Sequence, residues 1–184
     1  MNARRYSALC AALDRPAYCH VPDGGPFSPR ELARSDEPER WSGPRQPTIY
    51  LAGDVGVAIA ELGRHTPHLP TEAPDRRRLL RIAATFDRVL DLTRPEVLRA
   101  LALDAGPGQF VDRDHARAVA TEIRESGDCE ALLVPSVAFL DQPWRWNLVV
   151  FAERLRAPIE LAIGQAEDVG GVCLLSAPRP TPTG

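Results

Sequence analysis

The sequence predicts an α+β fold with a mixed β-sheet core and flanking helices. Short apolar runs of strand length, at residues 47–52, 131–134 and 147–151, are separated by segments with helical spacing, such as 112–126. The alternation is irregular and shows no internal repeat, which favours a mixed sheet over a regular βαβ arrangement. A chain of 184 residues is long enough for one domain with a substantial core.

The first quarter of the chain contains little regular patterning. Residues 1–13 have helical spacing, with Leu9 and Leu13 on one side, and 17–21 are a candidate first strand. Residues 22–47 are rich in Pro, Gly, Ser and charge, so we expect a long loop. A loop of this length inside a compact domain is uncommon and is often functional.

A short strand is expected at residues 47–52. Alternate side chains of a strand point to opposite faces. Thr48 and Tyr50 therefore share one face, and Ile49 and Leu51 share the other.

The helix after this strand is expected to begin behind Asp54, a good N-cap residue, and to end near Arg64. Strand, turn and helix together can bring the phenol of Tyr50, the guanidinium of Arg40 and the carboxylate of Glu61 to one cleft. We expect the functional site in that cleft.

The middle of the chain continues with strand and helix patterns. Residues 79–92 alternate like a strand, and a separate strand can begin at Phe86. Thr93 is a candidate cap for a helix that has Pro95 near its start.

A helix capped by Asp112 or Asp114 is expected to run to about Ser126. The expected strands after it lie at residues 131–134, 147–151, 159–163 and 172–175. The Pro/Thr-rich tail from Pro178 is expected to be disordered.

Composition and charge argue against several classes of function. The net charge of −3 is unlike the concentrated basic face that a nucleic-acid binder usually presents. No apolar run approaches the ~20 residues of a membrane span, and the N-terminus lacks the apolar stretch and cleavage site of a signal peptide. We therefore expect a cytoplasmic protein that binds neither nucleic acid nor membrane.

All 22 residues counted as Lys or Arg are Arg. The lack of Lys excludes a Walker-type phosphate loop and a Schiff-base enzyme. Any phosphate must be held by Arg, helix N-termini or backbone amides. The four cysteines are far apart with no CxxC pair, so we expect buried thiols and no metal site.

Three segments, taken in order, carry a resemblance to a known family. They are Arg40-Trp41 with Ile49-Tyr50-Leu51-Ala52 and Glu61; Val89-Leu90-Asp91-Leu92-Thr93 with Pro95-Glu96-Val97-Leu98; and Leu133-Val134-Pro135-Ser136 with Asn147-Leu148-Val149-Val150-Phe151. Together they resemble the RES-domain family, the toxin half of bacterial RES–Xre toxin–antitoxin pairs. The likeness covers residues 17–165, which leaves 1–16 as an N-terminal helical extension and 166–184 as a C-terminal strand and disordered tail.

The resemblance implies a fold similar to that of ADP-ribosyltransferases and an enzyme that cleaves the nicotinamide–ribose bond of NAD. Family members use water or inorganic phosphate as the acceptor, so NAD would be a substrate and no cofactor would be retained. The resemblance also implies a cognate Xre-type antitoxin as partner. A homodimer remains open.

The family's site residues correspond to Arg40, Tyr50, Glu61 and Ser136 of this sequence. Cleavage of an N-glycosidic bond builds positive charge on the ribose, which Glu61 is expected to stabilise. Arg40 is expected to hold the pyrophosphate, and Tyr50 to stack on or hydrogen-bond nicotinamide. Ser136 is expected to offer its hydroxyl to the phosphate or the amide, while Asn147 either contacts the substrate or bonds backbone across a turn.

The sequence lacks two arginines that the family pattern commonly has near this site. The family commonly has Arg next to the aromatic of the first strand, where this chain has Tyr18-Cys19, and Arg two residues after the Pro-Ser, where it has Ala138. Two alternatives therefore stand beside the NAD-degrading enzyme: an ADP-ribosyltransferase that acts on a protein, and a catalytically inactive binding module. The candidates to supply the missing charge are Arg45, His20 and Arg145.

Overall fold

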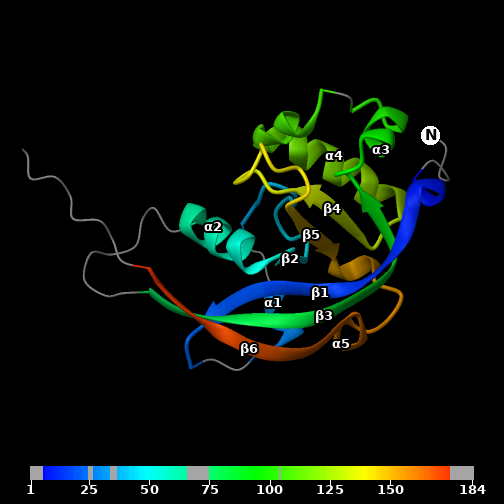
Figure 1. Ribbon diagram of the computed structural model, residues 1–184. Helices are drawn as coiled ribbons and strands as arrows, with labels where there is room; N and C mark the ends of the chain where they lie inside the picture. The colour runs from blue at the N-terminus through cyan, green and yellow to red at the C-terminus, as the bar shows by residue number, and fades with distance from the viewer. Residues whose placement is uncertain (1–5, 25–26, 34–36, 66–74, 104, 175–184) are drawn as a thin grey trace, which may run out of the picture.

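The computed structural model describes residues 6–24, 27–33, 37–65, 75–103 and 105–174 (Figure 1). The strands within these residues are β1 (Cys10–Pro22), β2 (Thr48–Ala52), β3 (Asp75–Asp91), β4 (Ala131–Pro135), β5 (Trp146–Phe151) and β6 (Ile163–Leu174). The helices are α1 (Pro29–Leu32), α2 (Val55–His65), α3 (Pro95–Ala100), α4 (Arg113–Ser126) and α5 (Ile159–Ala162), and 3₁₀ turns lie at Ser7–Leu9, Pro107–Val111 and Ala152–Arg154.

The described strands form one sheet in the order β1-β2-β5-β4-β3-β6, and β1 also pairs with β3. The first five strands of this order therefore close on themselves, and β6 lies outside the closed part. The β3–β4 pair is parallel and the other pairs are antiparallel. The predicted α+β fold with a mixed sheet is confirmed.

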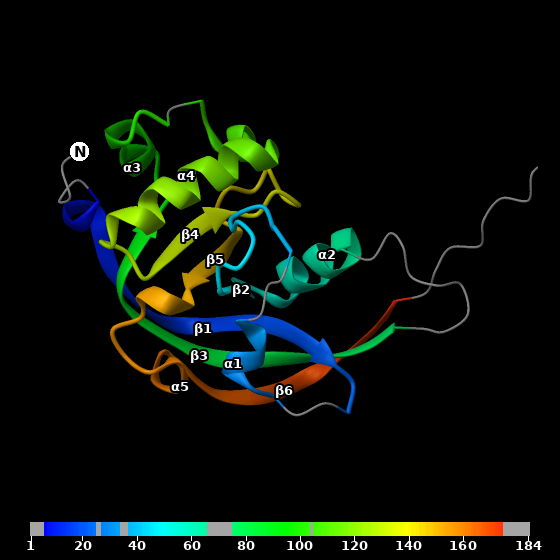
Figure 2. The same cartoon turned by 180° about the vertical axis from the view of Figure 1, so that it is seen from behind.

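The sheet has two layers, which Figures 1 and 2 show from opposite sides. β2, β5 and β4 form one layer, and the long strands β1, β3 and β6 form the other; α3 and α4 cover the outer face of the first layer. Ile49 and Leu51 of β2 pack between the layers, while Tyr50 packs on the α3–α4 side. The alternation that the sequence predicts for this strand is therefore confirmed.

A tight turn joins β2 to α2, and it fixes the helix direction. Asp54 caps the helix as expected, because its Oδ1 accepts from the backbone N of Val57 at 2.9 Å. Gly53 lies against the indole of Trp146, where an added Cβ would be 2.6 Å from Cε2. The turn therefore has no room for a side chain, and the approach of Trp146 sets where α2 begins.

The helix expected over residues 1–13 is wrong for the part that is described. A 3₁₀ turn is followed by β1, which begins at Cys10 and so includes residues 10–16 of the expected 1–16 helical extension. Cys10 pairs with Leu90 and Leu13 with Phe86 of β3. These partners are distant in sequence, and such pairing overrides a local helical pattern.

The strand expected at residues 159–163 is also wrong. Ile159–Ala162 form helix α5 after Pro158, and β6 begins at Ile163 and contains the expected strand from Val172 onward. A short apolar run does not distinguish a strand from a buried helical turn. Residues 175–184, which contain the expected disordered tail, lie outside the described residues.

No second strand begins at Phe86, because β3 continues to Asp91. The buried carboxylate of Glu130 accepts from the backbone N of Asp87 at 2.9 Å and of Arg88 at 3.0 Å. It satisfies these groups just before the β3–β4 pairing starts at Val89.

Two further helix caps were expected, and one of them is wrong. Asp112 caps α4 by accepting from the backbone N of Asp114 and His115. Thr93 does not cap α3; its N and Oγ1 both donate to Asp91 Oδ1, and Arg94 takes the N-cap position without a side-chain cap.

The expectation of four buried thiols is wrong for two of them. Cys19 and Cys129 are buried, Cys10 is half-buried and Cys173 is exposed. The Cys10 and Cys129 sulfurs lie 3.1 Å apart.

No helix in the described part of the chain has the length and hydrophobicity to cross a membrane.

Candidate functional site

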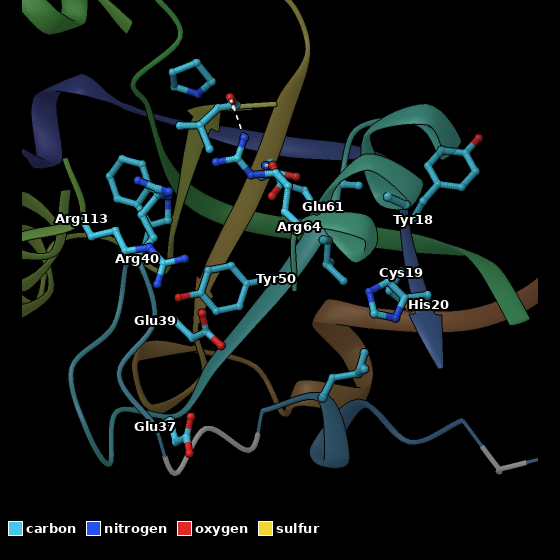
Figure 3. A pocket seen from close by; sticks show the side chains of 18 residues that line it. Tyr18, Cys19, His20, Glu37, Glu39, Arg40, Tyr50, Glu61, Arg64 and Arg113 are labelled. Atoms are coloured by element: carbon cyan, nitrogen blue, oxygen red, sulfur yellow. Dashed lines mark hydrogen bonds between the residues drawn. The ribbon is translucent and has the colours of Figure 1, made fainter. Parts of the chain in front are cut away.

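A cavity of about 760 Å³ lies beside β1, β2 and α2, below the start of α4. Its apolar and aromatic walls come from β1, β2 and the loop before β2, and residues from the ends of β4 and β5 complete it. Figure 3 shows its charged side chains arriving from separate segments. They are Glu37, Glu39, Arg40, Glu61, Arg64 and Arg113.

Glu61 is fixed in this cavity by two side chains, one just after the end of β4 and one near the start of β5. Ser136 Oγ and Asn147 Nδ2 each donate to Glu61 Oε1 at 3.0 Å. No hydrogen bond from a described residue reaches Oε2. One carboxylate oxygen is therefore held in place, and the other can accept a bond from a ligand.

Ser136 reaches Glu61 because β4 ends there. Its backbone N donates to Arg145 O at 2.9 Å, and the following turn returns the chain toward β5. Ser136 is fully buried and does not line the cavity. Its geometry therefore makes it a support for Glu61, where the sequence suggested a direct contact with the ligand.

Asn147 lines the cavity from β5, opposite Ala52 of β2. The structural alternative considered for it, a bond to backbone across a turn, is replaced by the side-chain bond to Glu61. Ser136 and Asn147 thus converge on one carboxylate oxygen from two neighbouring strands.

Tyr50 presents its ring to the cavity, and its hydroxyl shares a hydrogen bond of 3.1 Å with the buried Ser42. Burial raises the pKa of Tyr50 to about 12. The phenol is therefore neutral at physiological pH, and it can stack or hydrogen-bond but does not act as an anion.

Arg40 lines the cavity, and its side chain also binds the backbone of the 3₁₀ turn Pro107–Val111. Its Nη1 donates to the carbonyls of Phe110 at 2.8 Å and Val111 at 2.6 Å. A guanidinium has five N–H donors, and these two bonds engage both hydrogens of Nη1. The donors on Nε and Nη2 form the remaining edge, whose geometry matches two oxygens of a phosphate.

Arg64 and Arg113 line the same cavity, and the sequence interpretation missed both. Arg64 lies three residues after Glu61, so helical spacing was an available signal for it. Arg113 is the first residue of α4 and carries no local signal, because only the packing of α4 brings it to the cavity.

His20, Arg45 and Arg145 were the candidates to supply the basic charge that the family pattern has and this sequence lacks, and only one of them lines the cavity. His20 lines the cavity, and Arg45 and Arg145 do not. Arg145 instead lies 3.6 Å from Asp54 and over the ring of Phe139.

No metal site is evident in the described residues, where His, Cys, Asp and Glu side chains form no group of three or more that could hold an ion. The sequence also places Glu61, His65 and His68 close together, which is not a zinc-binding pattern, and His68 lies outside the described residues.

Comparison with known proteins gives one family and one fold. A family model described as RES domain matches residues 13–169. A chain in the crystal structure of the M. tuberculosis MbcT–MbcA toxin–antitoxin complex is 23% identical, with a TM-score of 0.66 and coverage of 91% of both chains. No curated protein matches the chain.

Proposed function

Because the chain belongs to the RES-domain family, we propose that it cleaves the nicotinamide–ribose bond of NAD and acts as the toxin of a toxin–antitoxin pair. The observation that carries the proposal is the Glu61 carboxylate, which two side chains hold by one oxygen at the edge of a cavity. A fixed carboxylate is suited to a reaction that develops positive charge on a sugar.

The proposed reaction breaks the bond between ribose C1 and the pyridinium nitrogen. The electron pair of that bond goes to nicotinamide, which leaves neutral and needs no strong general acid. Oxygen of water or of inorganic phosphate then bonds C1, and its proton is released. Glu61 faces the oxocarbenium-like state and can accept from a ribose hydroxyl.

The size and charge of the cavity support a dinucleotide. About 760 Å³ lies within the usual range of ligand pockets. Cationic and anionic side chains both line it, which suits a molecule whose phosphates lie between hydroxyl-bearing sugars. Arg40 can hold a phosphate through its open edge, and Tyr50 offers an aromatic face to nicotinamide.

The toxin role is supported by the family and by the toxin–antitoxin complex that contains the structural neighbour. We propose an Xre-type antitoxin as the partner and the cytoplasm as the site of action, because NAD is available there. We also propose a relationship to ADP-ribosyltransferases, which a carboxylate-bearing cavity beside a mixed sheet would suit.

Product analysis tests the reaction and its alternatives. Purified protein is incubated with NAD labelled in the adenosine half, with and without inorganic phosphate, and small-molecule and protein-bound label are separated by mass. We expect nicotinamide with ADP-ribose or its phosphorylated form. Label on protein would favour the transferase, and intact NAD after prolonged incubation would favour the inactive binding module.

A further inference from the structure

Three arginines from three segments converge on the cavity. Arg40 comes from the loop before β2, Arg64 from α2 and Arg113 from the start of α4, as Figure 3 shows. After burial, the positive charges of Arg113 and Arg64 are the strongest causes that lower the pKa of Arg40. The three guanidinium groups therefore interact electrostatically across the cavity.

These charges are not neutralised by carboxylates in contact with them. No described Asp or Glu lies within ion-pair distance of Arg40, Arg64 or Arg113. Elsewhere, for example, Arg117 lies 3.1 Å from Asp114. The carboxylate of Glu61 raises the pKa of Arg40 and so offsets part of the repulsion among these like charges, and an anion bound between them relieves the part that remains.

Backbone carbonyls anchor two of the three guanidinium groups. Arg40 Nη1 is bound to two carbonyls, and Arg64 Nη1 donates to Val137 O at 3.2 Å. Each arginine retains further donors, and the loss of freedom on binding is reduced because the side chains are already anchored.

We propose that Arg64 and Arg113, together with Arg40, form the subsite for the pyrophosphate of the dinucleotide. The assignment rests on the proposed function for the identity of the ligand. Arg64 is one helical turn after Glu61, so this subsite adjoins the carboxylate at which the nicotinamide ribose reacts. Arg113 closes the subsite from α4.

The group that the three arginines would bind is a phosphoryl oxyanion, and two molecules could supply it. One source is the pyrophosphate of the substrate, and the other is inorganic phosphate used as acceptor. We assign the pyrophosphate because three separate cations match two linked phosphates better than one small anion.

Calorimetry with ADP-ribose tests the assignment without turnover. Wild type, Arg64→Gln and Arg113→Gln are titrated with ADP-ribose, with adenosine and with inorganic phosphate. Arg99→Gln is the matched control, because Arg99 is an exposed helical arginine on α3 that does not line the cavity. Thermal unfolding of each variant checks that it is folded.

We expect each cavity substitution to weaken ADP-ribose binding about tenfold and to leave adenosine binding unchanged. Arg99→Gln should bind like wild type. ADP-ribose affinities within twofold of wild type in both cavity variants would overturn the assignment. So would loss of inorganic phosphate binding alone, because the arginines would then serve the acceptor. If NAD is not cleaved but ADP-ribose binding depends on Arg64 and Arg113, the proposed reaction fails and the subsite stands.

Discussion

Ser136 Oγ donates to Glu61 Oε1 at 3.0 Å, although the two residues are 75 positions apart in the chain. Ser136 is buried behind the cavity wall, so its hydroxyl acts on the reaction through the orientation of the carboxylate. We expect Ser136→Ala to lower kcat for NAD about tenfold with little change in KM, since a bond to a charged group is lost.

Steady-state kinetics of nicotinamide release measure this effect. Ser126→Ala is the control, because the Ser126 hydroxyl bonds Ile123 O at the end of α4, outside the cavity. Full kcat in Ser136→Ala, combined with loss of activity in Glu61 variants, would show that the bond does not orient the carboxylate.

The ring of Tyr50 should matter more than its hydroxyl. Tyr50→Phe retains the aromatic face and loses the hydroxyl with its bond to Ser42, so we expect kinetics close to wild type. Tyr50→Leu removes the face that nicotinamide would stack on, and KM for NAD should rise about two- to tenfold. An unchanged KM in Tyr50→Leu would place nicotinamide elsewhere in the cavity.

Two glycines, Gly53 in the turn before α2 and Gly63 on α2 itself, allow a prediction about stability. Gly53→Ala places a Cβ against the Trp146 ring, and we expect a loss of about 1–3 kcal/mol in the free energy of unfolding. Gly63→Ala on α2 meets no atom within 4 Å and should add about 0.5–1 kcal/mol. Urea denaturation measures both, and equal effects of the two substitutions would contradict the close approach of Trp146.

Alkaline pH should destabilise the protein through two buried acids. Burial raises the pKa of Cys19 from 9.0 to about 12 and that of Tyr50 from 10.0 to about 12. The folded state keeps these protons after the unfolded state has lost them, so their contribution is complete below pH 9 and is lost by about pH 12. Each pKa unit corresponds to about 1.4 kcal/mol.

Urea denaturation between pH 8 and pH 12 measures this loss. Cys19→Ala should flatten the decline above pH 9, and Cys173→Ala should not, because Cys173 is exposed. Identical pH profiles for wild type and Cys19→Ala would rule out Cys19 as a source of the alkaline loss.

Local patterns in the sequence predicted the elements whose side chains alternate or cap within a few residues. The two faces of β2 and the Asp112 cap are such cases. β1 and α5 were mispredicted because their conformation depends on distant partners or on a run too short to show a period.

The residues of the site also fall into those that local sequence patterns predict and those that only the fold brings together. The resemblance pointed to Glu61 and Ser136 as site residues and left the role of Asn147 open, but no local spacing predicts that the three side chains meet. Arg64 could have been found from its spacing to Glu61, whereas Arg113 reaches the cavity only through the packing of α4. Local spacing therefore reveals neighbours on one helix, and contacts between elements require the fold.

The most direct test of the account compares nicotinamide release from NAD by wild type and by Glu61→Gln. The amide has the shape of the carboxylate and can still accept from Ser136 and Asn147, so the fold should be retained while the negative charge is lost. We predict that wild type releases nicotinamide and that Glu61→Gln is slower by about a hundredfold or more. Release by Glu61→Gln within twofold of wild type, or no release by folded wild type, would contradict the account.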